Sequence, residues 1–279
     1  MTPEQLVSRC KGITSLPTIY RRLDESINDP YSDLSDIAFI LSDDPSLTAR
    51  LLRIANSAMF NFPSQVETVS RAITVIGTKQ LRDLVLATSV IELFKNIPDQ
   101  HVNMESFWRH SIATGIAARV IATYRREANV ERFHVLGLLH DIGRLIMYLQ
   151  IPEELNSAIE LSVDKGIPVY QVEKQLLGFD HTAVSEVLLS QWQLPVSLQE
   201  GVAYHHAPGH AKRYPEEAAT VHVADIIVNA FKLGNSGEPS VPLFVESAWT
   251  RLGLENEKLP LISEQLLLQY GAAVDLFLG

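Results

Sequence analysis

The sequence has almost no cysteine: Cys10 is the only one among 279 residues. A single cysteine excludes an intrachain disulfide, and nothing around Cys10 makes it a nucleophile, so a reducing compartment is expected. The chain also lacks a long apolar run, because stretches such as 37–41 and 266–268 are far shorter than the roughly 20 residues that span a bilayer. Its first residues contain neither the basic nor the apolar stretch of a secretory signal. We therefore expect a cytoplasmic protein that is not a membrane protein.

Positive charge is scarce as well. The chain has 23 Lys and Arg against 33 Asp and Glu, so its formal net charge is −10. General nucleic-acid binders need Lys and Arg to replace the counterions of the phosphate backbone. The charge balance therefore argues against general nucleic-acid binding, although it leaves a local basic patch open. Hydrophobic residues make up 46% of the chain, which is typical of a globular protein and not of a disordered one.

The pattern of apolar residues is helical almost throughout. Apolar residues recur at spacings of three and four, whereas alternating runs of β-branched residues are rare. The clearest stripe runs from 45 to 59, behind Asp44 as a helix N-cap and Pro45 at the first helical position. Further stripes lie within 112–120, 135–149 and 221–231. We predict an all-α protein, built as a multi-helix bundle.

Histidine is absent from the first hundred residues, and all nine histidines lie between His101 and His222. Turn-forming residues at 96–99 separate the two parts. We predict an N-terminal helical subdomain over 1–100 and a histidine-bearing helical domain over 101–279, which ends in a helical tail. Any chemistry is expected in the second part.

Histidines and aspartates in that part lie on predicted helices or at their ends. Imidazole nitrogen and carboxylate oxygen are ligands of divalent transition metals, and crossing helices can bring such ligands to one point. The adjacent pair His140-Asp141 has Gly137 and Gly143 on either side, which indicates close packing or access for a ligand. Asp225 lies in an apolar run, so its carboxylate must be metal-bound or in a buried ion pair with Arg or His. The candidate metal ligands are His110, His140, Asp141, His181, His205, His206 and Asp225.

A lone histidine on a helix is more often a surface or core residue than a ligand. We expect this of His101, His134 and His210.

The order His110, His140-Asp141, Asp225 resembles the metal signature of the HD superfamily of metal-dependent phosphohydrolases. His181 and the pair His205-His206 resemble the additional ligands of its HD-GYP branch, which hold a second metal. The stretches 172–181 and 192–195 are also similar to that branch. The glutamate and the Gly-Tyr-Pro motif that follow the double histidine there are absent, since Ala207-Pro208-Gly209 follows it here. The resemblance therefore does not extend to recognition of cyclic di-GMP.

The first hundred residues point to a different branch. Ser15-Leu16-Pro17 and the stretches 44–58 and 72–77 resemble elements of the HD-related output domain, HDOD. With them, the resemblance covers about residues 10–230. It implies an HD-domain-like helical fold and a bacterial signalling module that acts by binding rather than by hydrolysis. The chain nevertheless keeps every position of the metal signature that can be matched.

Two hypotheses follow, and the sequence leaves open whether the protein is an enzyme. In the first, it is a regulatory output module of signal transduction that binds signalling proteins or a small nucleotide-like ligand, with a structural or vestigial metal site. In the second, it is a metal-dependent phosphohydrolase or a phosphodiesterase of (cyclic) nucleotides.

The resemblance gives the second hypothesis a set of roles. His140 and Asp141 would be the catalytic pair, and Asp141 would bridge two metal ions. Arg144 would bind substrate phosphate, or else form a surface salt bridge. The cofactor in either case is a divalent transition metal (Fe, Mn, Zn or Ni), as one or two ions; the residues do not choose among these metals.

Overall fold

A computed structural model describes residues 1–57, 60, 62–95, 97 and 102–278. Every regular element in these ranges is a helix, and they contain no strand, so the all-α prediction is confirmed. Residues 58 and 59, at the end of the predicted 45–59 stripe, and 98–101, around the predicted domain boundary, lie outside the described ranges.

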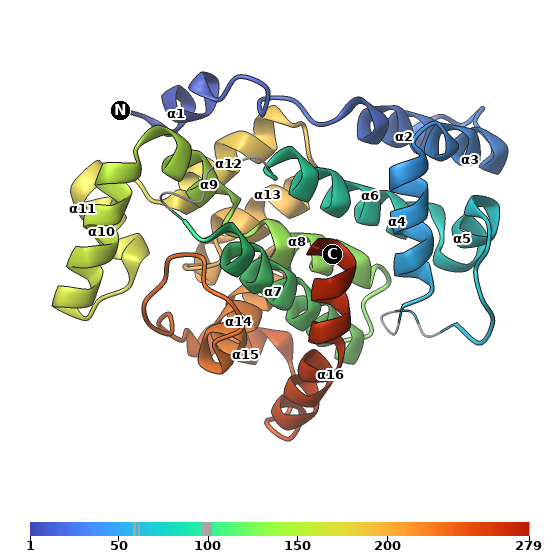
Figure 1. Cartoon of the computed structure of the whole chain (residues 1–279). Helices are drawn as coiled ribbons and strands as arrows, with labels where there is room; N and C mark the ends of the chain where they lie inside the picture. The colour runs from blue at the N-terminus through green and yellow to red at the C-terminus, as the bar shows by residue number, and fades with distance from the viewer. Residues whose placement is uncertain (58–59, 61, 96, 98–101, 279) are drawn as a thin grey trace.

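The first part of the chain forms six helices within the described ranges. They are α1 (Pro3–Arg9), α2 (Thr18–Asn28), α3 (Leu34–Ser42), α4 (Pro45–Ala55), α5 (Val69–Ile76) and α6 (Thr78–Leu93). Helices α2 to α5 gather at one end of the molecule (Figure 1). The Asn56 side chain joins the end of α4 to the following loop, because its amide accepts from Val66 N (2.7 Å) and donates to Val66 O (2.8 Å). This part of the 44–58 stretch is therefore structural.

The second part is built around α7, α8 and α14. Its elements are α7 (Met104–Tyr124), α8 (Val130–Leu139), α9 (Ile142–Gln150), α10 (Pro152–Lys165), α11 (Val169–Leu177), α12 (His181–Gln191), α13 (Val196–Ala203), the 3₁₀ turn η1 (Pro208–His210), α14 (Pro215–Phe231), α15 (Glu246–Leu252) and α16 (Lys258–Leu278). Helices α7 and α8 cross closely because Gly137 lies directly on the backbone of Thr114, where a Cβ would overlap it. The glycine before His140 therefore serves close packing.

One predicted helical stripe is interrupted in the structure. The stripe over 135–149 is broken into α8 and α9, since Asp141 has non-helical dihedral angles (φ −100°, ψ 12°). The double histidine follows the end of α13 at Ala203, since Tyr204 leaves the helical region (φ −113°, ψ 15°). Apolar periodicity continues across the break at Asp141 because α8 and α9 face the same core. His140, Asp141 and His205 therefore lie at helix ends.

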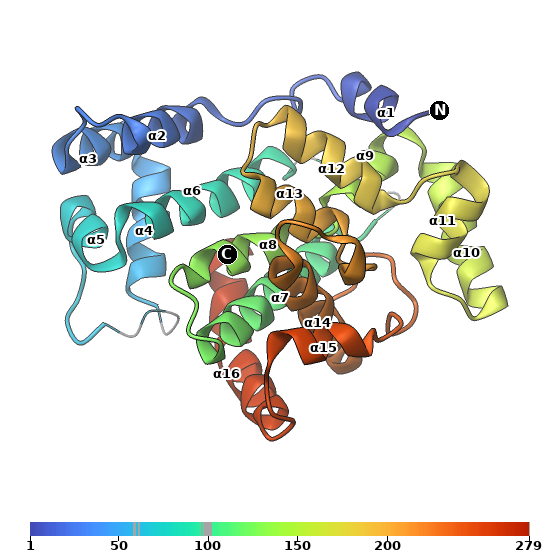
Figure 2. The same cartoon turned by 180° about the vertical axis from the view of Figure 1, so that it is seen from behind.

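The two terminal helices each reach across the molecule. Helix α1 packs on α9 and α12, and the Trp192 indole donates to Ile13 O (2.8 Å). Helix α16 packs on α7 and also contacts α4. Figure 2 shows α1 beside α9 and α12, away from α2 to α5. A division at residue 100 stays a prediction. No helix in the described ranges is long and apolar enough to cross a membrane.

Candidate metal centre

The structure brings all seven predicted ligands together. His110 comes from α7, His140 and Asp141 from the α8–α9 junction, and Asp225 from α14. The remaining three histidines come from the start of α12 and from the turn after α13. The seven form two groups, in each of which the ligand-type atoms lie within 4.8 Å of one another: His110, His140 and Asp225 in the first, and Asp141, His181, His205 and His206 in the second.

The first group has the spacing of a shared ion. His110 Nε2 lies 3.3 Å from His140 Nε2 and 3.2 Å from Asp225 Oδ1. His140 Nε2 lies 3.6 Å from the same carboxylate oxygen. Ligand bonds of about 2.0–2.2 Å place neighbouring ligand atoms roughly 3–3.5 Å apart around a metal ion. The three side chains therefore converge as ligands of one ion would.

The ligand-type atoms of the second group are also spaced as they would be around one ion. His181 Nε2 lies 3.0 Å from Asp141 Oδ1 and 3.2 Å from His206 Nε2. His205 Nε2 lies 3.8 Å from Asp141 Oδ1.

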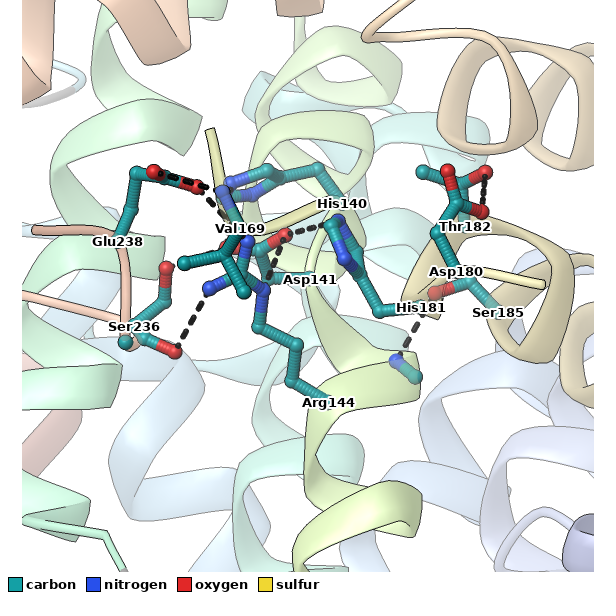
Figure 3. Close-up of polar contacts among 12 residues, drawn as sticks. His140, Asp141, Arg144, Val169, Asp180, His181, Thr182, Ser185, Ser236 and Glu238 are labelled. Atoms are coloured by element: carbon teal, nitrogen blue, oxygen red, sulfur yellow. Dashed lines mark hydrogen bonds and ion pairs between the residues drawn. The ribbon is translucent and has the colours of Figure 1, made fainter. Parts of the chain in front are cut away.

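Asp141 connects the two groups. Its Oδ2 lies 3.2 Å from His140 Nε2, whereas its Oδ1 faces His181, as Figure 3 shows. The Ser236 hydroxyl donates a hydrogen bond to Oδ2. Because each carboxylate oxygen faces a different group, Asp141 has the geometry of a bridging ligand.

The outer ring nitrogens of three histidines are held by hydrogen bonds. The Nδ1–H of His140 donates to Gly137 O and that of His205 to Val202 O, each at 2.7 Å. His181 Nδ1 lies 2.7 Å from a Glu173 carboxylate oxygen. Such partners fix the tautomer and leave the Nε2 lone pair free, which is the usual arrangement of a metal-binding imidazole.

The donor set fits a divalent cation. Asp141 Oδ1 and His205 Nε2 are buried, yet neither takes part in a hydrogen bond, which is costly for polar atoms in a protein interior. A cation held by the second group would satisfy both atoms.

The carboxylates also favour positive charge in the groups. Burial opposes a charged His140, but the negative charge of Asp141 and hydrogen bonds to Asp141 and Asp225 outweigh it and raise the pKa of His140 to about 10. Burial and the charge of His140 instead lower the pKa of His205 to about 3. Protons therefore compete with a metal ion for this centre.

The centre is almost closed to solvent. Six of the seven side chains belong to residues that are at most 4% exposed, and only His206 is partly exposed. A bound ion would be shielded from water on most sides.

Arg144 forms salt bridges, but the prediction that they lie at the surface is wrong, because Arg144 is 1% exposed. Its Nη2 lies 3.2 Å from a Glu238 carboxylate oxygen, its Nε 3.6 Å from Asp141 Oδ1, and its Nη1 donates to Ser236 O at 3.4 Å (Figure 3). The loop after α14 folds back over α9 and buries the guanidinium. A role of Arg144 in binding phosphate stays a prediction.

Sequence reasoning missed several residues that support the ligands or Arg144. Glu173 holds His181, Ser236 holds Asp141, and Glu238 holds Arg144. Asn229 Nδ2 donates to Asp225 Oδ1 at 2.7 Å. Only Asn229 carried a local signal, since it lies one helical turn after Asp225.

The other histidines that the structure describes lie outside the two groups. His134 is buried and stacks on Phe277 with ring centroids 5.6 Å apart, and His210 is exposed. His222 is also buried: its Nδ1–H donates to His205 O (2.7 Å) and its Nε2 accepts from Val245 N (3.0 Å), so it supports the double histidine. His101 lies outside the described residues.

Residues 13–208 match the HDOD domain family. The match covers well over half of the chain, and the chain belongs to this family.

Solved structures of similar fold come from several bacteria. An HDOD domain protein of unknown function from Geobacter sulfurreducens is 26% identical, with 95% of this chain and 93% of that chain covered and a TM-score of 0.79. A Shewanella amazonensis protein, provisionally named a phosphohydrolase, is 24% identical (98% and 96% covered, TM-score 0.73). A Marinobacter aquaeolei protein, provisionally named a signal transduction protein, is 19% identical (95% and 59% covered, TM-score 0.72).

An uncharacterized protein of Treponema pallidum (strain Nichols) is 24% identical over 225 residues. That alignment covers 80% of this chain but only 43% of the relative, so the chain spans less than half of its length.

Proposed function

We propose that this HDOD protein is a metal-binding regulatory module of signal transduction. The observation that carries the proposal is a complete set of seven ligand-type side chains enclosed in the helical core. Enclosure suits an ion that is retained to hold α7, α8, α12 and α14 together, and it does not suit a substrate that must enter and leave. The output would then be a contact with a signalling protein or with a small nucleotide-like ligand. The name of the Marinobacter protein is in line with this proposal.

In this proposal the ion supplies positive charge at the meeting point of buried carboxylates. His110, His140 and Asp225 would hold one ion, and His181, His205 and His206 a second, with Asp141 between them. Glu173, Ser236 and Asn229 keep the ligand side chains in place through the hydrogen bonds described above.

One observation favours the second candidate, a metal-dependent phosphohydrolase or phosphodiesterase. The two oxygens of Asp141 face different groups. Two-metal hydrolases hold their ions roughly 3.5–4 Å apart and use them to activate water and to stabilise charge on phosphate oxygens. Shewanella amazonensis proteins provisionally named phosphohydrolases share this fold.

Metal analysis tests the shared part of both candidates. Purified protein, reconstituted with Fe, Mn, Zn or Ni, should retain one or two ions per chain. The variant His140→Ala should lose most of this metal, because His140 contacts both carboxylates of the centre. His210→Ala is the matched control, since His210 is exposed and outside the centre, and it should retain wild-type metal content. A wild-type chain that binds no metal after reconstitution would overturn the proposal.

Turnover separates the two candidates. The metal-loaded protein is assayed on a generic phosphodiester and a panel of nucleotides, with His140→Ala beside it. Metal without turnover supports the regulatory module. Turnover that disappears in His140→Ala supports the hydrolase instead.

A further inference from the structure

The two ligand groups differ in their exposure. His110, His140 and Asp225 of the first group lie in the core, at most 4% exposed. The second group includes His206, which is the only partly exposed member of the seven. An ion in the second group therefore has the shorter path to solvent, past His206.

Helix α11 covers the path from the second group to solvent. Tyr170 stacks on the ring of His206, with centroids 4.2 Å apart and an angle of 15° between the planes. Lys174 Nζ lies 5.7 Å from the Tyr170 ring centroid and 2.8 Å from Asp180 Oδ2. Asp180 caps α12, whose first residue is His181. Tyr170, Glu173 and Lys174, spaced three and four apart, thus form one face of α11 that touches the second group or its support.

Helix α11 meets the continuous apolar core through Leu177, at its C-terminal end. It packs mainly on α10, and this pair lies at an edge of the molecule in both Figure 1 and Figure 2. Its buried residues Val169 and Val172 lie outside the continuous apolar core. The contacts that join α11 to the site are polar or ring contacts, including Val169 N to Glu238 Oε1 at 3.2 Å. These contacts can open without disrupting the core.

We infer that α11 is a cover over the second group and that Tyr170 sets the rate at which an ion enters and leaves it. The inference rests on the proposed metal binding. It makes the two groups inequivalent: the ion at the first group is retained, whereas the ion at the second group exchanges with solvent. Opening the first group would require separating α7 from α14, which pack together in the centre of the fold.

The test follows the release of metal and needs no substrate. Protein loaded with two equivalents of Zn²⁺ is mixed with an excess of a chromogenic chelator. The wild type should release zinc in two phases, one equivalent each. Tyr170→Ala should accelerate the fast phase at least tenfold and leave the slow phase unchanged. Tyr170→Phe keeps the ring over His206 and should release zinc at the wild-type rate.

Tyr124→Ala is the matched control. Tyr124 also lies under a lysine, with Lys258 Nζ 5.8 Å from its ring centroid, but it ends α7 far from the ligands. It should leave both phases unchanged. Lys174→Met is a second variant that keeps the ring but removes the bond to Asp180, and it should accelerate the fast phase less than Tyr170→Ala does.

The outcomes are distinct. Equal fast phases in the wild type, in Tyr170→Ala and in Lys174→Met would overturn the inference while leaving metal binding intact. Acceleration of both phases together would also overturn it, because the groups would then open as one. A wild type that takes up no Zn²⁺ or other metal would remove the proposed function and this inference together.

Discussion

Burial acts to lower the pKa of His134, His140 and His205, and neighbouring charges either add to this effect or oppose it. Burial and the positive charge of Arg119 lower the pKa of His134 to about 4. His140 is equally buried, but the neighbouring carboxylates raise its pKa to about 10. Burial thus keeps His134 neutral at neutral pH, whereas the carboxylates keep His140 charged when no metal ion is bound.

His134 should make the protein less stable at acidic pH. An unfolded histidine has a pKa near 6.5, so between pH 6.5 and pH 4 the unfolded state binds a proton that the folded state does not. The stabilising effect of a neutral His134 is complete above pH 6.5 and is lost as the pH falls toward 4. Between pH 7.5 and pH 5 the loss amounts to about 2 kcal/mol.

The variant His134→Gln isolates this effect, because the other histidines titrate alike in both proteins. The free energy of unfolding, measured in urea, is compared at pH 7.5 and pH 5 for both proteins. The decrease between these two pH values should be about 2 kcal/mol smaller in His134→Gln than in the wild type. Parallel pH dependences of the two proteins would contradict the assignment.

At the scale of elements, the centre depends on how closely α9 lies on α12. Gly143 N donates to Ser185 Oγ at 2.9 Å, and a Cβ on Gly143 would overlap His181 O and the Ser185 backbone. This contact sets the position of His181 relative to Asp141. Gly143, after the His140-Asp141 pair, therefore serves close packing. This is one of the two alternatives that the sequence left open, the other being access for a ligand.

Gly143→Ala should force the two helices apart. We expect a loss of about 1–3 kcal/mol in the free energy of unfolding, from overpacking, and weaker Zn²⁺ binding in a competition titration. Gly209→Ala is the control, since nothing lies within 4 Å of its added Cβ, and it should behave as the wild type. Unchanged zinc affinity in Gly143→Ala would mean that α9 and α12 adjust without moving the ligands.

Over the whole molecule, the terminal helices tie the two parts together. Leu6 and Val7 of α1 are buried, and α1 packs on α9 and α12 of the histidine-bearing part. Helix α16 reaches back to α4. Each predicted subdomain therefore contributes a helix that packs on the other subdomain.

A fragment of residues 102–279 should not fold as the full chain does, because the surface under α1 and α6 would face water. We expect its unfolding, followed by circular dichroism, to lose the cooperative transition of the full chain. Mixing it with a fragment of residues 1–101 should restore the transition in part. A fragment that melts cooperatively at the midpoint of the full chain would establish 102–279 as an independent domain.

Residue identities and local patterns were enough to predict the helical class and the seven side chains that meet in the centre. Helical periodicity is a local property, and the ligand chemistry belongs to the side chains themselves. The break at Asp141 escaped prediction because the apolar pattern runs through it.

The contacts between distant segments appear only in the folded chain. Ser236 and Asp141 lie 95 residues apart, yet they share a hydrogen bond, and the loop that carries Ser236 also buries Arg144. The bridging position of Asp141 and the cover formed by α11 also arise from contacts between segments that are distant in the sequence. Periodicity shows which face of a helix is buried, but it holds no information about which element lies against that face, and packing alone decides it.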